Sequence, residues 1–192
     1  QIQGIPGDVF NKKHLTHLPP QDLKALAKEF VKFNERCFVR LLADMRSYNY
    51  VVVITQDFDR VQYRIRAMDF DQQSYEGNPR VYKPQFLKEN FPLVDMSLKL
   101  LAEESIHQYE KEERSLLAKR AVRENKRLSQ LLACMRDDVL STPEKTDQLK
   151  KGLFKLTGDV NFKKSKSMGE LLTNTLDFVT RNYKNENPFI LN

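Results

Sequence analysis

The hydrophobic pattern of the chain begins with a helical period. Apolar residues recur three and four positions apart from Leu23 to Leu42, which predicts one long amphipathic helix that runs to about Met45. Pro20 can occupy the first turn of this helix, because the N–H that proline lacks would have no partner there. Residues 1–20 are rich in Gly and Pro, so we expect turns before the helix.

The period then changes to the alternation of β-strands. Residues 50–54 form a largely β-branched run, and residues 61–68 alternate apolar and polar side chains. The acidic segment TQDFDR joins the two runs, so we predict a β-hairpin. The first strand should be buried on both faces, whereas the second should expose a polar face that carries Arg64 and Arg66.

Residues 72–96 interrupt the regular pattern. Pro and Gly recur there together with four aromatic residues, so we predict a structured loop that packs against the body of the protein. The composition of residues 84–89 also allows a short helix.

The C-terminal half, from residue 97 onward, predicts helices. Opposite charges three or four positions apart support a helix over residues 103–127. Further helices are expected over residues 128–140, over residues 143–156 with Gly158 beyond the end, and after a capping box at Ser167–Glu170.

The order of these elements defines the expected fold class. A long helix, a β-hairpin, a structured loop and a helical C-terminal half predict a mainly α protein of the α+β class. A lone hairpin is only marginally stable in water, so it should pack against the helices. We expect residues 1–192 to form a single domain, with the helix, hairpin and loop in residues 20–96, the helical part in residues 97–183 and a tail in residues 184–192. The first residue is Gln1 and not Met, so we expect a processed chain or a fragment of a longer one.

Composition narrows the class of protein further. Hydrophobic residues make up 40% of the 192 residues and charged residues 30%, which is typical of a globular protein in water. No apolar run approaches the roughly 20 residues of a membrane span, and no signal-peptide pattern occurs, so we predict a cytoplasmic protein without a membrane partner. The net charge of +6 allows an anionic partner without requiring one.

The two cysteines exclude a disulfide framework. Cys37 and Cys134 each lie on an apolar helix face, so both are predicted to be buried free thiols, and a reducing compartment fits this usage.

Candidate chemistry gathers at the ends of the predicted hairpin. Asp69 and Asp71 follow its second strand, while Asp44 and Asn49 precede its first strand and are five positions apart. Because a hairpin brings the end of its second strand beside the start of its first, Asp69 and Asn49 should converge. Carboxylate and amide oxygens are ligands of the kind that Mg²⁺ prefers.

This order of elements and residues resembles the larger lobe of protein kinases and aminoglycoside-phosphotransferase-like enzymes. The segment LADMRSYN (42–49) has Asp and Asn at the spacing of the family's catalytic Asp and metal-binding Asn. The segment AMDFD (67–71) stands where the DFG motif would, with Asp71 in place of glycine. The resemblance covers about residues 20–100.

The resemblance implies a phosphotransferase that uses Mg²⁺ and ATP. Asn49, Asp69 and Asp71 would then bind the metal, and Asp44 would position the acceptor hydroxyl. The two residues before Asp44 differ from the family pattern, and the chain contains no Gly-rich phosphate loop and no strand lysine of the VAIK type. The expectation is therefore a kinase-like module that is active, degenerate or partial.

The same residues also have a purely structural interpretation. Asp69 and Asp71 can cap the turn after a strand with their own side chains. Asp44 would then be an exposed helical charge, and Asn49 would end the helix. His14 and His17 form a further candidate metal pair, for which no third ligand is evident nearby.

Two other classes of function compete with the kinase-like one. The narrow apolar stripe of residues 103–127 can pack within the domain or against a second copy, which predicts a non-enzymatic interaction or oligomerisation domain. Basic clusters at residues 120–127 and 150–166 can contact phosphates, which predicts a nucleic-acid-binding module, although solvated helix faces also explain them.

Overall fold

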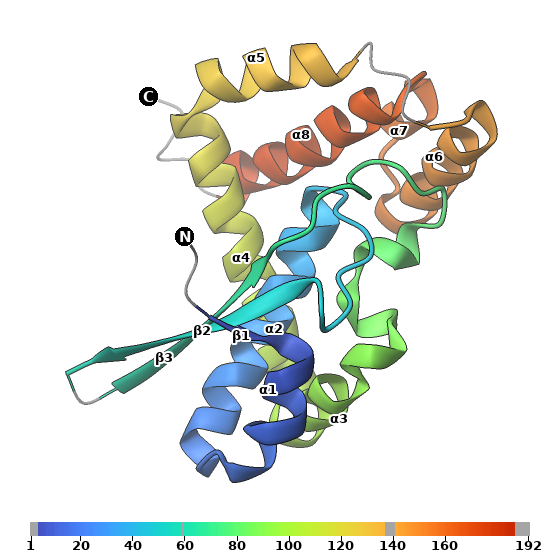
Figure 1. The fold of residues 1–192 in the computed structure, drawn as a ribbon. Helices are drawn as coiled ribbons and strands as arrows, with labels where there is room; N and C mark the ends of the chain where they lie inside the picture. Colours follow the sequence, from blue (N-terminus) through green and yellow to red (C-terminus); the bar gives the residue numbers. More distant parts are fainter. Residues whose placement is uncertain (1–3, 59, 137–140, 187–192) are drawn as a thin grey trace.

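The computed structural model describes residues 4–58, 60–136 and 141–186 and confirms the predicted mainly helical α+β class (Figure 1). The helices are α1 (Gly7–Lys13), α2 (Pro20–Val39), α3 (Phe91–Leu100), α4 (Glu103–Arg123), α5 (Asn125–Arg136), α6 (Pro143–Thr157), α7 (Asn161–Lys164) and α8 (Met168–Glu186). The strands are β1 (Ile5–Pro6), β2 (Tyr50–Asp57) and β3 (Arg60–Ala67). The long helix α2 packs against α3, α4, α8 and β3.

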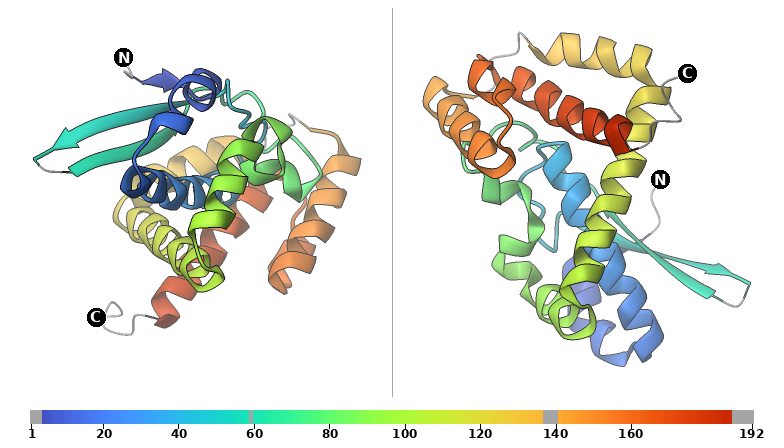
Figure 2. Two further views of the ribbon diagram at one scale, coloured as in Figure 1. Left: turned by 90° about the horizontal axis from the view of Figure 1, so that it is seen from below. Right: turned by 180° about the vertical axis from the view of Figure 1, so that it is seen from behind.

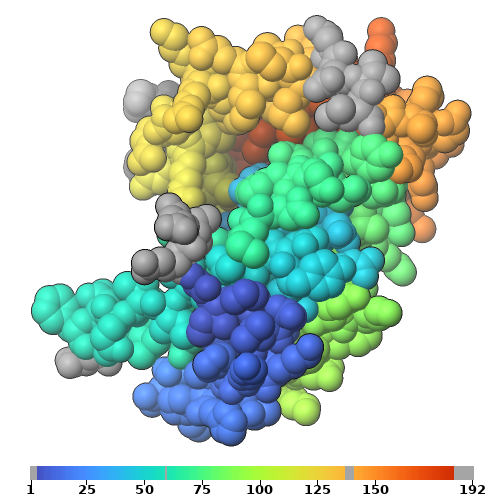
Figure 3. Space-filling model, in the orientation of Figure 1, coloured from blue at the N-terminus to red at the C-terminus, as the bar shows by residue number. Residues whose placement is uncertain are grey.

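The sheet is antiparallel with strand order β1-β2-β3. The predicted hairpin is confirmed, and its register runs from the pair Tyr50↔Ala67 to the pair Asp57↔Arg60 at the tip. The two-residue strand β1 adds to the other side of β2, and it is too short for the sequence pattern to have predicted it. The tip of the hairpin projects beyond the helices as a narrow arm (Figure 3).

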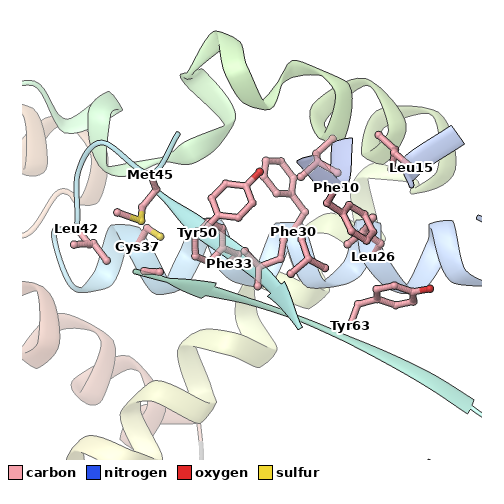
Figure 4. Packing of buried hydrophobic residues seen from close by; sticks show 14 residues of the cluster. Phe10, Leu15, Leu26, Phe30, Phe33, Cys37, Leu42, Met45, Tyr50 and Tyr63 are labelled. Atoms are coloured by element: carbon pink, nitrogen blue, oxygen red, sulfur yellow. The ribbon is translucent and has the colours of Figure 1, made fainter. Parts of the chain in front are cut away.

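The first part of the hydrophobic core lies between α2, α1 and the base of the hairpin. Aromatic side chains dominate it, and Figure 4 shows them packed side by side. Phe33 of α2 meets Tyr50 of β2 edge to face, with ring centroids 5.2 Å apart. Phe10 of α1 meets Tyr63 of β3 in the same manner at 6.4 Å. The packing against α2 explains how a lone hairpin is stabilised.

A second part of the core joins the C-terminal helices to the loop after the hairpin. Its fully buried members include Tyr82 of the loop, Leu153 of α6, Phe162 of α7 and Leu171 of α8. The prediction that the loop packs on the body is therefore confirmed. Its residues 79–90 form three short 3₁₀ turns, so the short helix considered for residues 84–89 is not an α-helix.

The predicted end of α6 and the predicted start of α8 are confirmed. Gly158 ends α6 in the left-handed conformation at φ 71°, which favours glycine, and its N–H donates to the Phe154 carbonyl. Before α8, the Ser167 hydroxyl accepts a hydrogen bond from the Glu170 N–H, as a capping box requires. The Glu170 carboxylate accepts from the N–H of Lys166.

The predicted end of the long helix was wrong. The helix ends at Val39 rather than near Met45, because Leu41 and Asp44 have φ angles of 48° and 55° that no α-helix contains. Leu41, Leu42 and Met45 are nonetheless almost fully buried. Their apolar side chains continued the helical period in the sequence although the backbone had already turned.

Two further expectations need correction. The charged helix predicted over residues 103–127 breaks at Glu124, so α4 and α5 are separate helices (Figure 2). Cys37 is buried as predicted, and burial raises the pKa of its thiol to about 12, whereas Cys134 is exposed.

The expected helix over residues 128–140 and the expected tail both extend outside the described residues. None of the helices within the described ranges has the length and apolarity that a bilayer crossing requires.

Candidate active site

The loop between α2 and β2 holds Asp44 and Asn49 in a fixed geometry. The loop leaves α2 through backbone hydrogen bonds from Leu41 and Leu42 to the last turn of the helix. Its start is then paired with the segment after the hairpin, since Ser74 N–H donates to the Leu41 carbonyl at 2.8 Å. The left-handed conformation of Asp44 turns the chain back toward β2. Asp44 is therefore a loop residue, which corrects the interpretation as an exposed helical charge.

Asp44 and Asn49 are in direct contact. The side-chain amide of Asn49 donates to the backbone carbonyl of Asp44 at 2.8 Å and to the Asp44 carboxylate at 3.2 Å. Because Nδ2 is directed at Asp44, the Asn49 carbonyl oxygen Oδ1 lies on the opposite side of the amide group. Asn49 also begins the hairpin, so its backbone position is set by the sheet.

The register of the hairpin places Met68 opposite Asn49, one residue before Asp69. The last ladder pair is Tyr50↔Ala67, and beyond it Met68 N–H donates to the Asn49 carbonyl at 2.9 Å. Asp69 is the next residue and is partly exposed. The convergence of the Asn49 and Asp69 side chains on one ion stays a prediction.

Asp69 also makes the local contact that the structural interpretation predicts. Its Oδ1 accepts a hydrogen bond from the Asp71 N–H at 3.2 Å, which is a turn cap that uses one of the two carboxylate oxygens. Asp71 itself is exposed. In the parts of the chain that the structure describes, no three His, Cys, Asp or Glu side chains are close enough to share a metal ion. Any ion at this site would therefore draw on the Asn49 amide and on water or phosphate oxygens, as Mg²⁺ commonly does.

Arg46 is a member of this site that the sequence analysis did not identify. Its guanidinium donates to the Asp44 carboxylate and to the Glu89 carboxylate, both at 2.7 Å. These hydrogen bonds raise the pKa of the Arg46 guanidinium above its ordinary value. The only sign of this role in the sequence is that a cationic residue stands two positions after Asp44. The pairing keeps the Asp44 side chain in one orientation at the surface.

Asn90 ties this loop to the 3₁₀ turns behind it. Its fully buried amide donates to the carbonyls of Met45 and Pro84, each at 2.9 Å, and accepts from the Tyr50 hydroxyl at 3.0 Å. The three partners come from three separate segments. Asn90 therefore fixes the loop without facing the candidate site itself.

Replacing Asn90 by alanine should lower the free energy of unfolding by about 2–4 kcal/mol. The reason is that each buried polar group left without a hydrogen-bond partner costs about 1–3 kcal/mol. Urea denaturation measures this loss. Asn78→Ala is the matched control: Asn78 is exposed and its side chain accepts one hydrogen bond from Arg80 N–H. A loss no larger than that of the control would contradict the role assigned to Asn90.

A buried set of charges attaches the hairpin to α2, and the sequence pattern did not reveal it. The Glu29 carboxylate accepts from Ile65 N–H at 2.8 Å, and the Arg36 guanidinium donates to the Ile65 carbonyl at 3.2 Å. Arg36 also pairs with Glu29 and lies 3.3 Å from Glu113 of α4. Arg64 lies 3.5 Å from Glu29. The only sign of this set in the sequence is that charged residues occur on the apolar face of the predicted long helix.

The remaining candidates from the sequence are not brought together into sites. His14 stacks on Phe10, with ring centroids 5.7 Å apart, and His17 lies in a short 3₁₀ turn. In the cluster at residues 150–166, Lys150 and Lys151 both pair with Asp147, which is the geometry of a solvated helix face. In the apolar stripe of α4, Ile106, Tyr109 and Leu117 pack within the chain, whereas Leu116 and Val122 are exposed.

Comparisons with known proteins add no relative. The chain matches no protein-family model, and neither a curated protein nor a solved structure shows significant similarity to it.

Proposed function

We propose that the base of the hairpin is the Mg²⁺-nucleotide site of a kinase-like phosphotransferase module. The observation that supports the proposal is the contact between Asn49 and Asp44 at the base of the hairpin. Asn49 donates to Asp44, and the ladder sets Asn49 beside the end of β3, where Asp69 follows. In phosphoryl transfer, catalysis rests on positioning and on neutralising charge, and such a triad supplies groups for both.

Each residue then has a distinct role. Asp69 Oδ2 and Asn49 Oδ1 would bind Mg²⁺, while water and the phosphates of the nucleotide complete its octahedron. Asp44, held by Arg46, would accept a hydrogen bond from the acceptor hydroxyl and orient it toward the phosphoryl group. Asp71 is exposed and would contribute charge near the ion.

The test is the thermal stability of the protein with and without MgATP. A ligand at 100 times its Kd stabilises the folded state by about 2.7 kcal/mol, which for a chain of this size raises Tm by about 5–10 °C. Asp69→Asn and Asn49→Ala should each remove most of this shift. Asp95→Asn is the matched control, since Asp95 is an exposed carboxylate on α3.

Binding of Mn²⁺ in place of Mg²⁺, followed by electron paramagnetic resonance, reports the metal directly. The wild type and Asp95→Asn should bind the ion in the presence of ATP, and Asp69→Asn should not. A folded wild-type protein with neither a thermal shift nor bound Mn²⁺ would disprove the proposal. An equal shift in Asp69→Asn would assign Asp69 to the turn alone.

A further inference from the structure

A groove separate from the candidate active site runs beside the hairpin. One of its walls is β3 with neighbouring residues of β2, and the other is formed by α2 and α4; its volume is about 1030 Å³. Figure 2 shows the hairpin reaching outward beside these two helices. Residues 60–67 of β3 line the groove. The groove is thus built from three separate parts of the chain, namely α2, the hairpin and α4.

Positive charge dominates the groove. Eight cationic side chains line it: Lys28, Lys32, Arg36, Arg40, Arg60, Arg64, Arg66 and Arg120. Among the described residues, only three carboxylates lie within 4.0 Å of any of them, namely Glu29, Glu112 and Glu113. The groove therefore keeps an excess of five positive charges after every nearby carboxylate is counted.

Several of these cations are arranged in a row. Arg60, Arg64 and Arg66 are on one face of β3, where positions two apart are about 6.6 Å from each other. Arg120 of α4 faces this row from the opposite wall. Arg60, Arg66 and Arg120 are exposed and have no carboxylate within ion-pair distance in the described part of the chain. A ligand with regularly spaced anionic groups would match this row.

The floor of the groove holds a buried guanidinium that is not fully bonded. The side chain of Arg36 is 7% exposed, and its Nη1 lies 3.3 Å from Glu113 Oε1 without forming a hydrogen bond among the described residues. Neighbouring cations add to the unfavourable field. Burial lowers the pKa of the Arg40 guanidinium, and the positive charges of Arg36 and Arg64 lower it further. An anion in the groove would relieve this repulsion.

We propose that the groove binds the sugar–phosphate backbone of a single-stranded nucleic acid. Six of the eight cations are arginines, whose planar fork binds phosphate in a bidentate manner. Phe70, half exposed at the end of the groove nearest Asp69, offers a ring on which a base can stack.

An acidic peptide fits this groove less well. An extended peptide would add to the open edge of β3 through backbone hydrogen bonds. That edge is blocked at its middle, because Glu29 and Arg36 already bond the N–H and carbonyl of Ile65. The row of side-chain cations remains accessible, and phosphates can reach it without using the strand edge.

The test is the fluorescence anisotropy of a labelled oligothymidylate titrated with the full chain over a range of salt concentrations. The triple variant Arg60→Gln, Arg66→Gln, Arg120→Gln should bind at least tenfold more weakly. Its log–log salt slope should fall by about 2, because each lost single-strand phosphate contact contributes about 0.7. The charge-matched control Lys155→Gln, Lys164→Gln, Lys166→Gln changes exposed cations of the C-terminal part and should bind like the wild type.

Several outcomes would overturn the inference. These are a wild type that does not bind the oligonucleotide at low salt, a triple variant that binds equally well, or polyglutamate that competes as strongly as the oligonucleotide. Tighter binding of a duplex of the same length would contradict the single-stranded specificity. Asp69→Asn should retain oligonucleotide binding, so the groove and the proposed nucleotide site can fail independently.

Discussion

Replacing Arg36 by methionine should destabilise the protein by about 3–5 kcal/mol, the typical cost of removing one partner of a buried ion pair. Methionine keeps most of the apolar stem and removes the charge. Glu29 and Glu113, which are 6% and 1% exposed, would then keep only Arg64, at 3.5 and 4.0 Å, as a nearby cation. The Ile65 carbonyl would also lose its donor, so β3 would be less firmly attached to α2.

Urea denaturation, followed by circular dichroism, measures this loss. The matched control is Arg123→Met, because Arg123 is 74% exposed and pairs with Glu124 at 3.0 Å, a kind of pair that contributes about 0–1 kcal/mol. Adding Glu113→Gln to Arg36→Met should cost less than the sum of the two single changes, since the unpaired carboxylate is then removed. Equal losses for Arg36→Met and Arg123→Met would show that the buried set of charges does not stabilise the hairpin.

Replacing Phe33 by alanine should cost a similar amount, about 3–5 kcal/mol, through lost burial and the cavity left behind. Phe33 is fully buried between α2 and the hairpin, and its ring contacts Tyr50 edge to face. Tyr50 follows Asn49 directly, so the change should also loosen the start of β2. We therefore expect the Asn49 amide to be less well ordered in Phe33→Ala even where the protein stays folded.

Phe58→Ala provides the control with the same chemical change. Phe58 is 96% exposed at the hairpin tip, so its removal should change the stability by less than about 0.5 kcal/mol. Urea denaturation compares the two variants, and amide hydrogen exchange at residues 49–54 reports the local effect. A Phe33→Ala variant as stable as Phe58→Ala would mean that the core is centred elsewhere.

Much of the fold could be predicted because the local patterns and the tertiary structure agree. The alternation over residues 61–68 predicted β3, and the Ser167–Glu170 box predicted the start of α8. The end of α2 could not be predicted in this way. Leu41 and Leu42 are buried by a loop that follows the helix, and burial leaves the same apolar signal whether the backbone is helical or not.

The candidate site, like the fold, could be predicted from the sequence only in part. The sequence by itself determined which polar residues flank the hairpin, and the register brings the Asn49 carbonyl to the Met68 N–H, one residue before Asp69. Only the tertiary structure decided that Asp44 turns back to accept from Asn49, that Arg46 pairs with Asp44, and that arginines of β3 and α4 face one groove. The physical reason is that strand pairing is local and periodic, whereas these contacts depend on how separate helices and loops pack around α2.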